Sequence, residues 1–207
     1  MTGELTTASV QWALGRFSAK MHLCADELNS LDGALGDGDL GVNMLRAADR
    51  LTTEAPNLPA DVGMALLKCA QAFTSVSAST YGTLLATGLM AAAKLTKSRT
   101  AVPWPEVSSL LGAAVQAMSD RGKGNLGDKT VLDAVEAVRR AAQGLNEPTN
   151  IAAAAIAAVA DAMDRLRDCQ FQQGRARIFG AKGIGRDDPG MVAFLRIVES
   201  LLPESSE

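Results

Sequence analysis

Apolar residues recur at steps of three and four along nearly the whole chain, which is the spacing of one face of an α-helix. In the first such segment Val10, Leu14, Phe17 and Met21 share a face, and Leu28 continues it. No alternating apolar and polar segment is long enough for a useful strand, and no internal repeat occurs. Eight helices are predicted, at about residues 10–28, 42–51, 59–73, 81–95, 103–118, 128–138, 150–169 and 189–202.

The ends of these helices and their short connections suggest how the chain is arranged. Pro103 and Pro105 are expected to open the fifth helix, and Asp128 is expected to cap the sixth. Asp188, followed by Pro189, is the expected N-cap of the eighth. Short connections favour antiparallel neighbours. The sequence therefore predicts an all-α fold, an eight-helix antiparallel up-and-down barrel or bundle, in a single domain over residues 1–207.

Four of the loops are rich in Gly, Asp, Ser or Thr, and they alternate with plainer connections. They cover residues 32–41, 74–80, 121–128 and 174–188, after the first, third, fifth and seventh helices. In an up-and-down array, alternate loops lie at the same end. We therefore expect all four loops to converge at one end of the barrel.

The composition narrows the classes of function. With 47% hydrophobic and 21% charged residues among 207, the chain is globular and not disordered. A net charge of −3 gives no basis for binding nucleic acid or an anionic membrane. His22 is the sole histidine, which excludes His-rich zinc sites and paired-histidine catalysis. Cys24, Cys69 and Cys169 are scattered, and no signal peptide or membrane-length apolar run occurs, so we expect a cytoplasmic protein.

The first of the four loops holds three carboxylates, Asp32, Asp37 and Asp39. The glycines between them let the backbone fold tightly, so that all three can face one centre. Carboxylates so close repel one another unless a hard cation binds them, and Mg²⁺ with open coordination positions fits best. The glycine and glutamate spacing of a calcium-binding EF-hand does not occur. The alternative is an Asp/Gly turn in which Asp39 caps the second helix.

The other three loops offer hydroxyl and cationic groups. In the loop Thr74–Thr80, which precedes a helix, hydroxyls and free N–H groups either hold an anion or cap the helix. Residues 121–128 are mildly basic, and residues 174–177 and 182–186 supply further cations. Facing the aspartates, these groups favour a site for Mg²⁺ and phosphate. The Walker A spacing does not occur in the chain.

Taken in order, several motifs resemble the dihydroxyacetone kinase L-domain family, also known as the Dak phosphatase domain. They are Leu31-Asp32 with Gly36-Asp37-Gly38-Asp39, Tyr81-Gly82-Thr83, Arg121-Gly122-Lys123 with Gly127-Asp128-Lys129-Thr130, Gly174-Arg175-Ala176, and Asp188-Pro189-Gly190. The resemblance spans residues 5–202. It implies an eight-helix barrel that binds ADP or ATP at one end through two Mg²⁺ ions.

The resemblance also implies a function as a phosphotransferase, the ADP-binding L subunit of a phosphotransferase-system-dependent dihydroxyacetone kinase. In that family the nucleotide is rephosphorylated by an M-type phosphocarrier subunit and donates to a hydroxy-ketone on a K-type subunit. A homodimer or hetero-oligomer is expected. No catalytic side chain is expected on this chain, since positioning and electrostatics do most of the work in phosphoryl transfer.

Carried over position by position, the family motif makes Asp32, Asp37 and Asp39 the Mg²⁺ ligands. It also implies a set of nucleotide contacts, in which Gly122 and Val131 flank the adenine and Arg175 pairs with a phosphate. The full set of implied nucleotide contacts is Leu40, Gly41, Val42, Asn43, Val76, Ser77, Gly122, Val131, Arg175, Asp188, Pro189 and Gly190.

The chain departs from the family pattern around the phosphates. Leu40 stands where the family commonly has histidine, and residues 74–78 lack the usual double glycine and Ser-Gly. Residues 181–183 replace the usual Glu-Arg-Ser. Three alternatives therefore stay open: a kinase for a different sugar or polyol, a phosphatase or nucleotide hydrolase that needs no partner, and a nucleotide-binding regulator without kinase activity.

Overall fold

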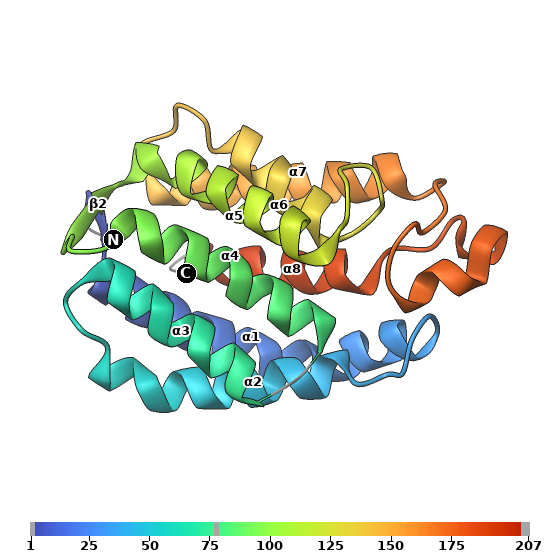
Figure 1. Cartoon of the computed structure of the whole chain (residues 1–207), viewed down its shortest axis with the longest axis horizontal. Coiled ribbons are helices and arrows are strands. Elements are labelled where there is room, and N and C mark those ends of the chain that lie inside the picture. Colours follow the sequence, from blue (N-terminus) through green and yellow to red (C-terminus); the bar gives the residue numbers. More distant parts are fainter. Residues whose placement is uncertain (1–2, 77–78, 204–207) are drawn as a thin grey trace.

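The computed structural model describes residues 3–76 and 79–203, and its helices run side by side along the long axis (Figure 1). Within these residues each of the eight predicted segments forms an α-helix. The helices are α1 (Thr7–Gly33), α2 (Leu40–Glu54), α3 (Val62–Val76), α4 (Thr80–Thr96), α5 (Val107–Gly122), α6 (Val131–Ala141), α7 (Pro148–Leu166) and α8 (Pro189–Ser200). Short 3-10 helices lie at η1 (Ala55–Asn57), η2 (Trp104–Glu106) and η3 (Arg175–Gly183).

The eight α-helices of the described residues form a closed ring. Each packs against the next one in the chain, and α8 also packs against α1. Their apolar faces point inward, and side chains such as Met21, Leu28, Met44 and Val159 are almost fully buried. Burial of these faces is the main source of stability for such helices. The predicted all-α up-and-down barrel is confirmed.

The start of α6 differs from the prediction. Thr130 is the N-cap, and it forms a capping box with Asp133, whose carboxylate accepts a hydrogen bond from the Thr130 N–H at 2.9 Å. Asp128, the predicted cap, instead accepts a hydrogen bond from the N–H of Asn125 at 2.7 Å within the preceding loop. The prediction for Asp128 is therefore wrong, because its carboxylate is bonded within the preceding loop and the Thr130 hydroxyl caps α6 instead.

The connection before α5 also differs from the prediction. Pro103 ends a short strand, β2 (Ala101–Pro103), and Pro105 lies in η2, so neither opens α5. Strand β2 pairs antiparallel with β1 (Glu4–Thr6), and Leu5 lies opposite Val102. Strands of three residues are too short to show an alternating pattern, which is why the sequence did not reveal them.

Several helix ends differ from their predicted positions by three residues or more; α1, for example, continues to Gly33 rather than ending at residue 28. Helix α3 starts at Val62 rather than at residue 59, because the carboxylate of Asp61 accepts a hydrogen bond from the Met64 N–H at 2.9 Å. Helix α7 ends at Leu166 rather than at Cys169. Among the described residues no helix is long and apolar enough to cross a membrane.

Candidate functional site

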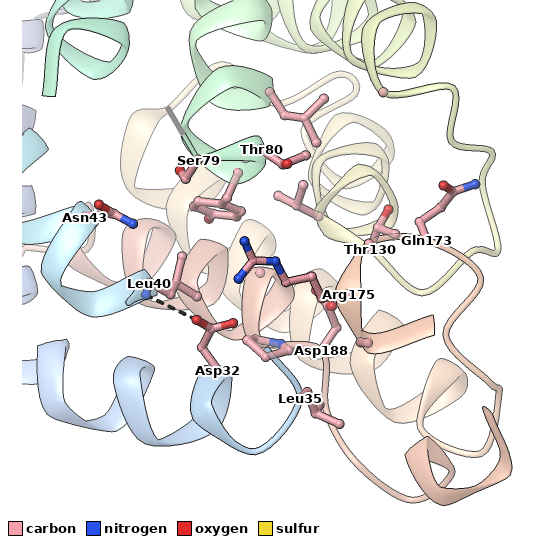
Figure 2. Close-up of a pocket in the computed structure, with 18 of the residues that line it drawn as sticks. Asp32, Leu35, Leu40, Asn43, Ser79, Thr80, Thr130, Gln173, Arg175 and Asp188 are labelled. Atoms are coloured by element: carbon pink, nitrogen blue, oxygen red, sulfur yellow. Dashed lines mark hydrogen bonds between the residues drawn. The ribbon is translucent and has the colours of Figure 1, made fainter. Parts of the chain in front are cut away.

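A cavity of about 570 Å³ opens at one end of the barrel. All four polar loop regions contribute to its wall, so their predicted convergence is confirmed. Figure 2 shows side chains from these separate elements pointing into one space. In or next to these loop regions the lining residues are Asp32, which lies in the last turn of α1, Asp37 and Asp39; Ser79 and Thr80; Gly122 and Gly124; and Gly174, Arg175, Asp188, Pro189 and Gly190.

An acidic wall forms one side of the pocket. Asp32, Asp37 and Asp39 each offer one carboxylate oxygen, and these oxygens lie within 4.8 Å of one another. The Asp32 Oδ2 accepts hydrogen bonds from the backbone N–H of Asp39 at 3.0 Å and of Leu40 at 3.4 Å, the second of which is drawn in Figure 2. Gly38, with a φ of 76°, supplies the left-handed turn that the loop requires. The result is a cluster of hard oxygen donors, the type that Mg²⁺ binds.

Two arginine side chains share the pocket with the acidic wall. Arg175 extends from η3 into the pocket (Figure 2), and it forms an ion pair with Asp37. Arg46, on α2, lines the same pocket. The planar N–H fork of arginine suits phosphate oxygens as well as carboxylates. The pocket therefore holds both signs of charge that a Mg²⁺–phosphate group requires.

The first turn of α2 lies beside the acidic wall, and Leu40 and Asn43 line the pocket. Gly41 and Val42, two of the implied nucleotide contacts, are not among the lining residues. A Cβ on Gly41 would lie 2.8 Å from a backbone carbonyl carbon of α1, so this glycine allows the two helices to approach closely. The Val42 N–H donates to the Asn29 Oδ1 at 3.1 Å, so it is bonded to α1.

The second polar loop is shorter than predicted, because Thr74, Ser75 and Val76 still belong to α3. The hydroxyls of Thr74 and Ser75 donate to backbone carbonyls one turn back in α3, at 3.0 and 2.8 Å. Both hydroxyls are therefore bonded to their own helix. Val76 lines the pocket. Ser77, the other predicted contact here, lies outside the described residues. Ser79, the N-cap of α4, also lines the pocket.

A second part of the pocket wall is apolar. A Cβ on Gly122 would lie 3.1 Å from Leu84 Cδ2, so the glycine leaves room beside this side chain. Such a surface suits an aromatic base, whereas phosphates suit the charged wall. The apolar part is formed by Tyr81, Leu84, Met118, Gly122, Val131 and Leu132.

The start of α8 closes the pocket. Asp188 is its N-cap as predicted, since its Oδ1 accepts a hydrogen bond from the Met191 N–H at 2.8 Å. Shielding from water raises the pKa of Asp188 to about 7, and the negative charge of Asp133 adds to the rise. A Cβ on Gly190 would lie 3.2 Å from the ring of Tyr81. The buried Tyr81 hydroxyl has no hydrogen-bond partner among the described residues.

Residues 34–203 match the DAK2 domain. The chain belongs to the DAK2 domain family. Over 88% of its length this DAK2 chain is 28% identical to the PEP-dependent dihydroxyacetone kinase, ADP-binding subunit DhaL, of Escherichia coli, and it covers 90% of that relative. It is 29% identical to the PTS-dependent dihydroxyacetone kinase, ADP-binding subunit DhaL, of Lactococcus lactis, with 94% and 95% of the two chains covered.

Longer proteins also contain a region similar to this DAK2 chain. Human triokinase/FMN cyclase is 30% identical over 86% of the chain, which covers 32% of that protein. The crystal structure of the dihydroxyacetone kinase of C. freundii in complex with AMP-PNP and Mg²⁺ matches 96% of the chain with a TM-score of 0.75 at 22% identity. The chain spans 34% of that structure, about a third of its length, and the match shows a shared fold.

The pocket of this DAK2 domain includes residues that sequence reasoning did not select. Arg46 lies three positions after Asn43, and Met118 lies four positions before Gly122, so each shares a helix face with a predicted residue. Helical periodicity could have found both of them. Gln173 also lines the pocket, but it lies in an irregular segment where no periodicity applies.

Asp188→Asn is expected to raise the melting temperature of the DAK2 domain by roughly 5 °C at pH 8 and much less at pH 5. The folded-state pKa of about 7 lies above the ordinary value of 3.8. The stability that Asp188 contributes is therefore complete below the ordinary value and is lost as pH rises through 7. Asparagine keeps the N-cap and removes the charge. Thermal unfolding at both pH values, with Asp26→Asn as an exposed control, measures this effect; an equal rise at both would contradict it.

Proposed function

We propose that this chain is the Mg²⁺-ADP/ATP-binding subunit of a dihydroxyacetone-type kinase, and that it relays a phosphoryl group to a hydroxy-ketone held on a partner K-type subunit. One observation carries the proposal: the pocket combines three carboxylate oxygens within 4.8 Å, an arginine paired with one of them, and an apolar wall. The E. coli relative, of which the chain covers 90%, is described as an ADP-binding subunit, which supports the same reading.

The acidic wall fits Mg²⁺. Two oxygen ligands on opposite sides of one Mg²⁺ ion are about 4.2 Å apart. The three carboxylate oxygens lie within 4.8 Å of one another, a slightly larger spread that can also hold two neighbouring ions. We propose that Asp32, Asp37 and Asp39 hold two Mg²⁺ ions. When bound, the ions neutralise phosphate charge. Because Arg175 is held beside Asp37, it is positioned to pair with a phosphate next to the metal ligands.

The remaining wall fits a nucleotide. We propose that Leu40, Asn43 and Val76 lie along the phosphates and that Gly122 and Val131 flank the base. Asp188, Pro189 and Gly190 would close the pocket around the nucleotide. The family resemblance adds Gly41, Val42 and Ser77 to the proposed contacts.

The chemistry is phosphoryl transfer to an alcohol group. Such a reaction depends on positioning and charge neutralisation more than on a protein nucleophile. The substrate hydroxyl, bound on the partner, would be the nucleophile. The pocket residues of this chain would therefore bind and orient the nucleotide and exclude water, and we assign none of them a covalent role.

The open end of the pocket offers a surface for partners. Ile178 on η3 is 82% exposed, and Leu126 and Ile184 on neighbouring loops are also exposed. Arg177 and Lys182 are exposed on the same η3 segment. Exposed apolar side chains among charged ones are typical of interaction surfaces. We propose that an M-type phosphocarrier and the K-type subunit bind here in a cytoplasmic complex.

Denaturing the purified protein and identifying the released small molecules by mass spectrometry tests the proposal. ADP or ATP is the expected result, because a nucleotide held as a cofactor stays bound through purification. If no nucleotide is released, and added Mg·ADP does not bind in calorimetry, the proposed function is wrong.

The same preparation separates the alternatives. We expect phosphorylation of dihydroxyacetone only when the K-type and phosphocarrier subunits are added together. Hydrolysis of a nucleotide without any partner would instead favour the hydrolase. Nucleotide binding without transfer to any ketone or polyol, with both partners present, would favour the regulator.

A further inference from the structure

Lys129 lies outside the pocket wall and is nevertheless the largest fully buried side chain among the described residues, with 2% exposure. It precedes α6 in a left-handed conformation, with a φ of 62°. Its ammonium donates hydrogen bonds to the carbonyl oxygens of Arg167 at 2.8 Å, Cys169 at 2.9 Å and Gly183 at 3.5 Å. A buried ammonium is costly unless its protons are bonded, and here three carbonyls receive them.

The three carbonyls belong to the two ends of one segment, residues 167–187, which connects α7 to α8. Its ends are held together by a hydrogen bond from the Gly185 N–H to the Arg167 carbonyl at 2.9 Å. The Arg167 guanidinium also pairs with Asp187 at 3.1 Å. Lys129 binds carbonyls on both sides of this closure, so its ammonium joins the segment to the start of α6.

An aromatic contact completes the closure. The Lys129 ammonium lies 4.4 Å from the centre of the Phe171 ring, a cation–π distance. A Cβ on Gly183 would lie 2.5 Å from that ring, so only glycine allows the returning chain to pack there. Lysine, ring and glycine therefore fix the base of the segment in one arrangement.

The segment carries one charged part of the pocket wall. Gln173, Gly174 and Arg175 line the pocket, and Arg175 pairs with Asp37. Further contacts tie the segment to the loop before Lys129, since the Asp128 Oδ2 accepts a hydrogen bond from Gln173 Nε2 at 3.1 Å. The placement of Arg175 against the acidic wall thus depends on how the base of the segment is held.

We propose that Lys129 is a positioning residue for the nucleotide, which fixes the segment 167–187 so that Arg175 faces the phosphates. This inference rests on the proposed function of the pocket. Lys129 touches neither the pocket nor the acidic wall, and it acts through the carbonyls of the segment. An apolar side chain of similar length would remove the ammonium donor from all three carbonyls. The Cys169 carbonyl would lose the Lys129 bond with no backbone N–H among the described residues to replace it, whereas the Arg167 and Gly183 carbonyls would keep one N–H each, and the segment would move to satisfy the lost bonds.

The test compares Lys129→Met with Lys123→Met. Lys123 also has a left-handed conformation, with a φ of 55°, but it is exposed and does not line the pocket. Calorimetry is expected to show Mg·ADP binding weakened by about tenfold or more in Lys129→Met, as when a charge-assisted contact to a phosphate is lost. Binding by Lys123→Met is expected to match the wild type. Hydrogen exchange should rise across residues 170–183 in Lys129→Met alone.

A double-mutant cycle separates positioning from a general loss of stability. If Lys129 acts through Arg175, adding Lys129→Met to Arg175→Ala should weaken binding further by no more than about twofold. If Lys129→Met weakens Mg·ADP binding by the same factor in the wild type and in Arg175→Ala, the inference is overturned. It is also overturned if Lys129→Met binds Mg·ADP as the wild type does while Arg175→Ala binds it more weakly. If Arg175→Ala itself binds Mg·ADP as the wild type does, the proposed pocket function fails first. Should Lys129→Met not fold, Lys129→Gln, whose amide keeps two N–H donors without the charge, enters the same cycle.

Discussion

Asp37→Ala is expected to abolish the contribution of Mg²⁺ to ADP binding. The Asp37 carboxylate is one of three oxygen donors within 4.8 Å, and removing one of them leaves a site too weak to hold the ion against water. We expect the affinity measured with Mg²⁺ to fall by at least about a hundredfold, to the value measured with a chelator present. Because Asp37 is exposed, the melting temperature should change little.

Calorimetry with and without Mg²⁺ measures this effect. The chelator comparison matters, because losing Asp37 also frees Arg175 from its ion pair and could strengthen binding of the nucleotide alone. Asp49→Ala is the matched control, since Asp49 is an exposed aspartate on α2 that does not line the pocket. A variant at Asp37 that still gains affinity from Mg²⁺ as the wild type does would rule out the acidic wall as the metal site.

Gly41→Ala is expected to destabilise the protein by about 3 kcal/mol. A Cβ at this position would meet the Ala25 carbonyl group, with its carbon only 2.8 Å away. Backbone atoms of two packed helices cannot move aside as a flexible side chain can, so α2 must shift away from α1. The shift would also move Leu40 and the acidic wall, and Mg²⁺-dependent binding should weaken together with stability.

Chemical denaturation measures the free energy of unfolding of this variant. Gly15→Ala provides the control, because Gly15 is an exposed residue of α1 with no atom near its would-be Cβ. That change should stabilise the protein by up to about 1 kcal/mol, as expected when alanine replaces glycine inside a helix. If both variants had the same stability, close approach of α1 and α2 would not be the reason for a glycine at position 41.

The helices and the convergence of the loops could be predicted because both follow from local periodicity. A face of apolar residues at helical spacing is visible in the sequence, and the parity of the connections places alternate loops together. The two three-residue strands could not be predicted, because a segment this short shows no alternation of apolar and polar residues. The predicted N-cap of α6, Asp128, is wrong. Asp128 and Thr130 are both good capping residues, and only the geometry of the loop decides which of them caps the helix.

The candidate site could be predicted only in part. Asp32, Asp37 and Asp39 are close in the sequence, so glycine-rich spacing alone suggested that they meet. The sequence marks Lys129 only as part of a motif, because its three acceptors belong to residues 38 to 54 positions away. Tertiary contacts of that range leave no pattern in a single sequence. Gly41 was assigned to the phosphates, and nothing local showed that it packs against α1.

A ring with an even number of antiparallel helices returns the chain to the end at which it started. Here α1 begins beside β1 and β2, at the end of the barrel away from the pocket, and α8 runs from the pocket toward that same end (Figure 1). Polypeptide joined at either terminus would therefore leave the mouth of the pocket uncovered. This geometry is compatible with a similar region occurring in proteins about three times as long, such as the human relative, of which this chain covers 32%. A purification tag at either terminus should likewise not obstruct nucleotide entry.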